Sequence, residues 1–379
     1  MTFCPPKFAH LTMRIVINAA GISDNFRQRE LRQYYSECLI RLARAESDSA
    51  FWVFPSQFFA GPEWTGVPLK AISLKGGLPF NALNRLWAAK RLGSEILSNK
   101  INVALSLGLP TIDIFSIPHF IWIADSESFR VPGKNLRWKK LLLKENVWLL
   151  VDSATDKNSM IETYSLKEEK ILVVPLAPSE TRQPMAWTDK EQIRVKYSGG
   201  REYFMARSYW PAENIMVLLK AFSIFKKRQQ TNMKLLIAGA AGEPDHTPHE
   251  KLESYKYRDD VHAYPGIAEK ELFKLEGSAY ALIQPVSESS GLSILNAMQS
   301  EVPVISARKP DDISGDTILY AEPFGQESMG EALIKLFTNE DMKNELIRKG
   351  RVWAAQYSIQ QSVGFLCEAF LSSRTDDRH

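Results

Sequence analysis

Short apolar runs alternate with longer helix-forming stretches along the chain, and this alternation strongly limits the folds open to it. In the first half, the apolar runs have strand length and are followed by turn or polar residues. They are RIVINA (14–19), AFWVFP (50–55), NVALSL (102–107), FIWIAD (120–125), VWLLVDS (147–153) and KILVVPLAPS (170–179). Strands that alternate with helices in this way are typical of doubly wound α/β domains.

The same alternation starts again after a polar stretch at residues 180–202. The second set of strand-like runs is YFMARS (203–208), MKLLIAG (233–239), DDVHAYPG (259–266), AYALIQP (279–285), VPVISA (302–307) and TILYAE (317–322). A chain of 379 residues is too long for one ordinary core. We therefore expect two α/β domains, 1–178 and 179–357. Ligands bind outside the carboxyl ends of parallel strands, so two such domains face to face would form a cleft.

Composition narrows the class of protein further. Hydrophobic residues make up 45% of the chain and charged residues 24%, as in soluble globular proteins. A net charge of +3 is too small to indicate nucleic-acid binding. The three cysteines are scattered, which is typical of reduced thiols in a cytosolic protein. Because no apolar stretch has the length of a signal peptide or a membrane span, we expect a cytoplasmic protein.

Two kinds of cofactor are not expected. His246 and His249 lie close together in the sequence, but no third metal ligand is evident. A dinucleotide-dependent oxidoreductase needs a G-x-G-x-x-G loop between a strand and a helix. Neither AAGISDNF (19–26) nor AGAAGEPD (238–245) supplies one at the right spacing.

The segment SESSGLSILNAMQSEVPVI, residues 287–305, places a small polar loop between an apolar strand and an apolar helix. Gly291 allows the backbone to approach a ligand, and the first helical turn offers unpaired N–H groups to an anion. Glu288 would lie where a carboxylate accepts hydrogen bonds from sugar hydroxyls, and Asn296 would bind a hydroxyl without adding charge. On these residues alone, a serine-capped connection with a solvated glutamate is the simpler explanation.

Several stretches, in order along the chain, resemble one known family. PVSESSGLSILNAMQSEVPVI resembles the segment PSxxEGFGLPxLEAMAxGxPVI of the retaining family-four glycosyltransferases. Other stretches that resemble the family's motifs are EKILVVPLAPS, SYWPAENIMVLLKAFSIF, LLIAG, VHAYPGIAEKEL, AYALIQPVSE and RKGRVWAAQYSIQQSVGFLCEAF. The resemblance covers most of the chain and implies the GT-B fold, in which two Rossmann-like α/β domains face a cleft.

The resemblance also implies a function. A retaining hexosyltransferase of this kind binds a nucleotide-sugar donor mainly through the C-terminal domain, here 179–357. It binds a glycan or lipid-linked acceptor mainly through the N-terminal domain, here 1–178, onto which the last helix, 358–379, packs back. No metal or other cofactor is implied, because backbone amides and basic side chains neutralise the diphosphate. We expect such a transferase to act in cell-surface polysaccharide synthesis.

The matched motifs imply particular site residues. Glu288 takes the place of the first glutamate in the family's E-x7-E pattern, and Asp125 that of the aspartate in a His-Asp pair. Both are expected to be catalytic. Gly21 follows the first strand, where the family often has a glycine-rich loop near the diphosphate. The residues expected to bind the donor are Arg207, Asn214, Ser289, Ser290, Gly291, Leu292 and Asn296.

Several positions depart from the family pattern. Asn296 replaces the second glutamate, which grips the ribose, and loses about 1 kcal/mol or more per charge-assisted bond. Ala212 and Glu213 replace an Arg-Lys pair that meets the diphosphate, although Arg207 could return one cation. Glu301 takes the place of a glycine. These replacements keep an alternative open, a catalytically degenerate homologue that binds a glycan or a partner protein.

Two stretches rich in lysine, arginine and tryptophan concern other partners. They are NRLWAAKRLG (84–93) and NLRWKKLLLKENVW (135–148). One interpretation is a basic, aromatic surface that holds the protein peripherally on the inner face of an anionic membrane. The other is a pair of amphipathic helices with solvated lysines. The aromatic stretch FFAGPEWTG (58–66) is a candidate for stacking on a sugar ring.

Overall fold

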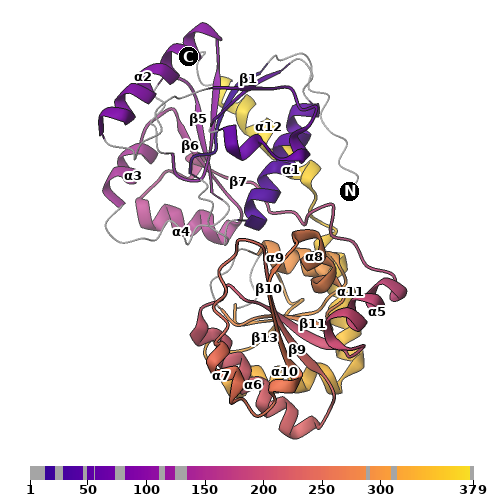
Figure 1. Cartoon of the computed structure of the whole chain (residues 1–379). Helices are drawn as coiled ribbons and strands as arrows, with labels where there is room; N and C mark the ends of the chain where they lie inside the picture. Colours follow the sequence, from indigo (N-terminus) through magenta and orange to yellow (C-terminus); the bar gives the residue numbers. More distant parts are fainter. Residues whose placement is uncertain are drawn as a thin grey trace. The chain divides into compact units, whose positions relative to one another are not determined.

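The computed structural model describes residues 13–21, 29–45, 49–54, 56–72, 82–110, 116–123, 135–286, 291–308 and 314–375. The chain forms two units, each built around its own sheet (Figure 1). The first unit contains Met1–Leu176 together with Ser358–His379, and the second contains Ala177–Tyr357. Each unit is therefore described by itself.

Seven parallel strands form the sheet of the first unit, in the order β3-β2-β1-β4-β5-β6-β7. They are β1 (Arg14–Asn18), β2 (Ala50–Phe54), β3 (Leu69–Ala71), β4 (Val103–Leu107), β5 (His119–Ile123), β6 (Val147–Val151) and β7 (Ile171–Val173). Each apolar run predicted as a strand in this half contributes one strand to the sheet, and β3 is added to them. The central strands are buried along their whole length, as expected for a parallel sheet covered on both faces.

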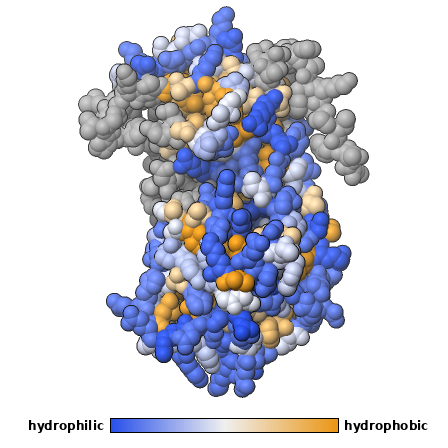
Figure 2. Space-filling view, turned by 45° about the vertical axis from the view of Figure 1, so that its right-hand side comes forward, coloured by the Kyte–Doolittle hydropathy of each residue, from blue (hydrophilic) through white to orange (hydrophobic). Residues whose placement is uncertain are grey.

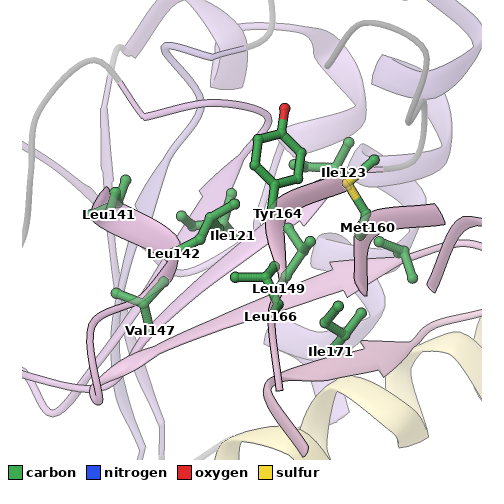
Figure 3. Packing of buried hydrophobic residues seen from close by; sticks show 11 residues of the cluster. Ile121, Ile123, Leu141, Leu142, Val147, Leu149, Met160, Tyr164, Leu166 and Ile171 are labelled. Atoms are coloured by element: carbon green, nitrogen blue, oxygen red, sulfur yellow. The ribbon is translucent and has the colours of Figure 1, made fainter. Parts of the chain in front are cut away.

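Helices cover both faces of this first sheet (Figure 1). They are α1 (Arg29–Ala45), α2 (Ala82–Ser98), α3 (Asn135–Leu142), α4 (Ala154–Tyr164) and α12 (Ile359–Thr375), with short 3-10 turns η2 (Ser56–Phe59), η3 (Pro62–Trp64) and η5 (Glu168–Lys170). Neighbouring residues of β5 pack on opposite layers, because side chains alternate along a strand. Ile121 and Ile123 join a cluster with Met160 and Tyr164 of α4 (Figure 3). Phe120 instead meets Phe370 of α12, with ring centroids 5.0 Å apart.

A serine–histidine pair lies inside this sheet rather than at its edge. The Ser106 hydroxyl and His119 Nε2 are 2.8 Å apart on the adjacent strands β4 and β5, and both side chains are fully buried. Burial, with a smaller contribution from Lys144, lowers the pKa of His119 from 6.5 to about 4. The imidazole is therefore neutral at physiological pH and helps to hold the two strands together.

Six strands form the sheet of the second unit, in the order β10-β9-β8-β11-β12-β13. They are β8 (Tyr203–Arg207), β9 (Lys234–Ala240), β10 (Val261–Ile267), β11 (Ala281–Gln284), β12 (Val304–Ser306) and β13 (Leu319–Tyr320). All neighbouring pairs are parallel. The predicted second α/β unit is thus confirmed as a parallel sheet with its strands where the apolar runs placed them.

The helices of the second unit also lie on both faces of its sheet. They are α5 (Trp187–Ser198), α6 (Ala212–Gln229), α7 (His249–Glu253), α8 (Glu269–Gly277), α9 (Leu292–Gln299), α10 (Gln326–Thr338) and α11 (Glu340–Ala354), with the 3-10 turn η6 (Arg258–Asp260). Phe204 of β8 packs on Phe225 of α6, with ring centroids 5.2 Å apart. The preceding residue, Tyr203, points the other way and donates a hydrogen bond of 2.7 Å to the Leu275 carbonyl of α8.

The chain between β7 and α5, residues 174–186, is the link between the two units, and its first residues are hydrogen-bonded within the first unit. The hydroxyls of Tyr34 in α1 and Ser362 in α12 both donate to the Pro175 carbonyl, at 3.0 and 2.9 Å. The helices α1 and α12, which are far apart in the sequence, therefore bind the same carbonyl group within the first unit.

The surface of each unit is mostly hydrophilic on the face seen in Figure 2, and hydrophobic residues form only small groups there. Among the described helices, none combines the length and the apolar character needed to cross a membrane.

Candidate functional site

Four of the described residues predicted to bind the donor lie at the ends of elements in the second unit: Arg207, Asn214, Gly291 and Leu292. Strands β8 and β11 are parallel neighbours, and the strand order reverses between them. Ligands of open α/β sheets bind at this kind of position, outside the carboxyl ends of the strands. Arg207 ends β8 and Asn214 lies in the first turn of α6, while Gly291 and Leu292 begin α9. The site therefore combines two strand ends with two helix N-termini.

Both predicted catalytic residues lie outside the described residues. Glu288, Ser289 and Ser290 fall in the stretch 287–290, and Asp125 falls in 124–134. Their expected roles stay predictions.

Asn214 ties the beginning of α6 to the end of β11. Its side-chain amide donates a hydrogen bond of 2.8 Å to the Pro285 carbonyl, and the side chain is buried. Asparagine suits this place because a buried carbonyl needs a donor and the amide adds no charge. The Asn214 side chain thus fixes the position of Pro285, the residue after β11, and does not project into solvent.

Ala212 and Glu213 are exposed in the first turn of α6. Pro211 precedes them and offers no side-chain cap to the free amides of the helix. A glutamate is favourable at the positive end of a helix dipole. The same carboxylate would repel an anionic ligand, so this helix start presents amides and one negative charge.

Asn296 lies in the buried face of α9. Its Oδ1 accepts a hydrogen bond of 2.9 Å from the Ser179 amide, in the link at the start of the second unit. Ile294, Leu295 and Met298 are also buried, so this stretch of α9 faces the interior. The structure therefore gives Asn296 a backbone partner in the link, whereas the family resemblance led us to expect a ribose hydroxyl.

Arg207 is also buried, and it is bound to acidic side chains. One guanidinium nitrogen lies 2.5 Å from a carboxylate oxygen of Glu243, and another lies 2.8 Å from Glu276. The guanidinium also lies over the Tyr209 ring, 4.9 Å from its centroid. The cation predicted for the mouth of the site is present, but its charge is already compensated.

Glu276 joins this arginine to a second one. Its other carboxylate oxygen lies 2.5 Å from Arg182, whose guanidinium stacks 3.5 Å from the centroid of Phe273. Burial alone would raise the pKa of Glu276, but the two guanidinium groups outweigh it and hold that pKa below its usual value. Glu276 is therefore a carboxylate at neutral pH.

Gly21 lies at the corresponding edge of the first sheet, after β1. A Cβ at this position would lie 2.5 Å from each of the carbonyl oxygens of Leu107 and Leu109. The carbonyl carbon of Gly108, which has φ +71°, would lie 2.7 Å from the same Cβ. The loops after the neighbouring strands β1 and β4 are thus in backbone contact, which only glycine permits.

Replacing Gly21 with alanine should lower the free energy of unfolding of the first unit by about 1–3 kcal/mol, because the added methyl group overlaps two backbone carbonyls. Gly93 in α2 is the matched control, since nothing lies within 4 Å of a Cβ there. Alanine in a helix stabilises relative to glycine, so Gly93→Ala should raise stability by up to about 1 kcal/mol. Chemical denaturation followed by circular dichroism measures both changes, and equal effects of the two would contradict the contact.

The aromatic stretch proposed to stack on a sugar is packed on itself. Phe58, Phe59 and Trp64 are all buried. The Phe59 ring centroid lies 4.8 Å from that of Phe58 and 4.9 Å from that of Trp64. Their faces are covered by one another, so this group stabilises the fold around η2 and η3.

The two histidines considered as metal ligands have other partners. His246 Nδ1 lies 3.1 Å from the Tyr209 carbonyl, and His249 Nε2 lies 2.6 Å from Asp245. In the described part of the chain, no three histidine, cysteine, aspartate or glutamate side chains come close enough to hold a metal ion.

Comparison with known proteins agrees with this geometry. Residues 188–353, within the second unit, match the model of the family "Glycosyl transferases group 1". The solved structure of a glycosyltransferase from Rickettsia africae superposes with a TM-score of 0.75 over 96% of this chain and 99% of that one, at 14% identity. The chain has the GT-B fold of glycosyltransferases.

Other proteins that are similar to this chain carry more specific names. Anabaena Alr3699/HepE, solved with UDP and glucose, superposes with a TM-score of 0.70 over 96% of this chain and all of that one (100%), at 13% identity. WaaG, described as a glycosyltransferase involved in lipopolysaccharide biosynthesis, superposes with a TM-score of 0.64 over 93% of this chain and 97% of that one, at 14% identity. The O-antigen chain mannosyltransferase RfbU of Salmonella typhimurium is 25% identical over 232 residues. That match covers 59% of this chain and 60% of RfbU.

Proposed function

We propose that this chain is a retaining hexosyltransferase of cell-surface polysaccharide synthesis. The observation that carries the proposal is the group 1 glycosyltransferase match over 188–353, which contains Arg207, Asn214 and the start of α9. RfbU is named an O-antigen chain mannosyltransferase and WaaG a glycosyltransferase involved in lipopolysaccharide biosynthesis, and these names support a glycan or lipid-linked acceptor.

The donor is a nucleotide sugar, and the second unit binds most of it. The start of α9, at Gly291 and Leu292, offers amide N–H groups and the positive end of a helix dipole to the diphosphate. Glu288 and Ser290 precede α9 in the sequence, and the Glu288 carboxylate is proposed to accept hydrogen bonds from sugar hydroxyls. HepE was solved with UDP, which makes UDP the first nucleotide to test.

In the proposed reaction, the bond between the sugar carbon and the diphosphate oxygen breaks and the diphosphate leaves with the electron pair. The acceptor hydroxyl attacks from the same face of the sugar and passes its proton to the leaving diphosphate. Electrostatic stabilisation of the leaving diphosphate by fixed amides and a guanidinium lowers the barrier. Asp125, which belongs to the first unit, is proposed to act on the acceptor. No metal or other cofactor is required by this scheme.

Nucleotide binding tests the proposal. Thermal denaturation of the full chain with millimolar UDP, GDP and their common hexose forms should show stabilisation by one nucleotide, since a ligand at 100 times its Kd adds about 2.7 kcal/mol. Glu288→Ala combined with Gly291→Val should abolish the effect. Glu253→Ala, an exposed carboxylate in α7, should leave it unchanged.

The second candidate is a catalytically degenerate homologue that binds a glycan or a partner protein. Two observations favour it: Ala212 and Glu213 put no cation at the start of α6, and Arg207 is held by two carboxylates. The absence of stabilisation by every nucleotide in the same experiment would support this candidate and contradict the transferase.

We also propose that the first unit rests on an anionic membrane surface from the cytoplasmic side, where lipid-linked acceptors would be found. Basic and apolar side chains share the exposed part of α2. Trp87 is 47% exposed, and the Arg91 guanidinium lies 5.9 Å from its ring centroid. Lys90 is exposed beside them, and Leu97 near the end of the helix is 78% exposed. Aromatic and basic side chains together are what an interfacial surface needs.

Reversing two charges on this surface, with Lys90→Glu and Arg91→Glu, should weaken binding to phosphatidylglycerol vesicles by about tenfold or more, since each basic residue contributes about 1 kcal/mol. Lys251→Glu with Lys270→Glu, exposed positions in the second unit, makes the same change in net charge as a control. Vesicle sedimentation measures the affinity. An equal loss in the two double variants would show that net charge, and not this surface, is responsible.

A further inference from the structure

Four charged side chains, Arg182, Glu276, Arg207 and Glu243, form a buried ion-pair network between the link and the end of β8. Arg182 of the link pairs with Glu276, and Glu276 pairs with Arg207. Arg207 then pairs with Glu243, in the turn after β9. Their side chains are 3%, 12%, 8% and 1% exposed, in that order along the chain of contacts. Exposed ion pairs contribute little, but a network this well enclosed is not screened by solvent.

The charges of this network cancel. Two guanidinium groups and two carboxylates leave no net charge, although Arg207 ends the strand at the ligand-binding edge of the sheet. A diphosphate that approached Arg207 would also approach the carboxylates of Glu243 and Glu276. An anion can use the full charge of this arginine only if one carboxylate moves away.

Glu243 is bound as an anionic ligand would be. One of its oxygens lies 2.5 Å from a nitrogen of the Arg207 guanidinium, and the other accepts a hydrogen bond of 2.7 Å from the Ala240 amide. A guanidinium and a backbone amide directed at one anion are the donors that proteins use for phosphate oxygens. A Cβ at Gly239 would lie 2.2 Å from Ser208 Oγ and 3.3 Å from Glu243 Oε2, so glycine leaves room chiefly for the serine and also for this carboxylate.

The two carboxylates differ in how firmly they are held. Glu276 lies in the last turn of α8 and is gripped by two arginines. Glu243 has one arginine, and it follows a tight turn in which Ala241 and Gly242 are exposed and Gly242 has φ +83°. A short turn can move without unfolding a helix, so Glu243 is the member of the network that can withdraw.

We propose that Glu243 is an internal competitor for the donor diphosphate. Its carboxylate occupies an anion position between the Arg207 guanidinium and the Ala240 amide, and it withdraws when a nucleoside diphosphate binds there. Arg207 stays in place because Glu276, itself anchored by Arg182, holds its other side. The nucleoside part of this inference rests on the proposed function, whereas the anion position itself would accept any diphosphate.

Calorimetric titration of the full chain with inorganic pyrophosphate and with UDP tests the proposal. Glu243→Gln removes the charge and keeps the shape, so it should bind pyrophosphate and UDP at least about tenfold more tightly than the unmodified chain. Glu253→Gln removes the same charge from the exposed end of α7, where solvent screens it, and should change the affinity by less than about threefold. If the glutamine variant does not fold, Glu243→Asp, which draws the carboxylate back by one methylene, should still tighten binding.

The two ligands separate failure of this inference from failure of the proposed function. Pyrophosphate that binds more tightly to the Glu243 variants, with no nucleotide bound by any form, would uphold the competitor and contradict the donor chemistry. UDP that binds the unmodified chain and Glu243→Gln equally well would uphold the donor site and overturn the competitor. Weaker binding of both ligands to the Glu243 variants would also overturn it, because Glu243 would then support the site.

Discussion

Replacing Glu276 with alanine should lower the free energy of unfolding of the second unit by about 3–5 kcal/mol, the cost of breaking a buried ion pair from one side. The substitution removes the partner of Arg182 at 2.5 Å and one partner of Arg207 at 2.8 Å. Neither guanidinium can lose its proton, so both stay charged in the interior. Arg207 keeps Glu243, whereas the contact of the Arg182 guanidinium that remains among the described side chains is the face of Phe273.

Glu271 supplies the matched control, because it lies in the same helix and has an ion pair of similar length. Its carboxylate is 2.6 Å from Lys196, whose side chain is 60% exposed. Glu271→Ala should therefore cost no more than about 1 kcal/mol, as exposed pairs do. Urea denaturation of the two variants measures the difference. If both variants lost the same free energy of unfolding, burial of the ion-pair network would add nothing to the stability of the second unit.

The first unit should lose about 3 kcal/mol of stability between pH 7 and pH 4 through His119 alone. Its pKa is lowered from 6.5 to about 4 by burial and by Lys144. A depressed pKa means that the unfolded chain takes up this proton at a higher pH than the folded chain does. Stability from the neutral imidazole is therefore complete above pH 6.5 and is lost as the pH falls toward 4. The difference between the two pKa values corresponds to about 3 kcal/mol at 1.36 kcal/mol per pH unit.

His119→Gln should remove this part of the pH dependence, since glutamine can keep a hydrogen bond to Ser106 but does not titrate. His249→Gln, at an exposed histidine paired with Asp245, should leave the acid side of the profile of the first unit unchanged. Urea denaturation of the three proteins at several pH values between 7 and 4 gives the profiles. A His119→Gln profile parallel to that of the unmodified chain would contradict the assignment.

The fold could be predicted closely because its strands are short, apolar and buried on both faces. The stretch VALSL of β4 is such a strand, and it was predicted as part of residues 102–107. Leu69–Ala71 forms β3 at the edge of the sheet, with Lys70 and Ala71 exposed. Three residues without an apolar pattern cannot be told from a loop, so only the pairing with β2 defines this strand.

The long-range contacts of the candidate site could not be predicted from the sequence. Gly291 was proposed from a turn and a helix start, and Arg207 and Asn214 from the family's motifs; their roles in donor binding stay predictions. The partners of Arg207 lie 36 and 69 residues away in the sequence, at Glu243 and Glu276. The link residue bound by Asn296 is 117 residues away. No sequence period connects such positions, so only folding the chain brings them together.

The most direct test of the central claim is to follow sugar transfer by proton NMR with a panel of UDP- and GDP-hexoses and lipid-linked acceptors. Hexosyl transfer from one donor should release the nucleoside diphosphate and give a product with the same anomeric configuration as the donor. Glu288→Ala should abolish this transfer, and Glu253→Ala should not. A product with inverted configuration would contradict the retaining mechanism. Failure to turn over any donor, together with failure to bind any nucleotide, would contradict the assignment as a glycosyltransferase.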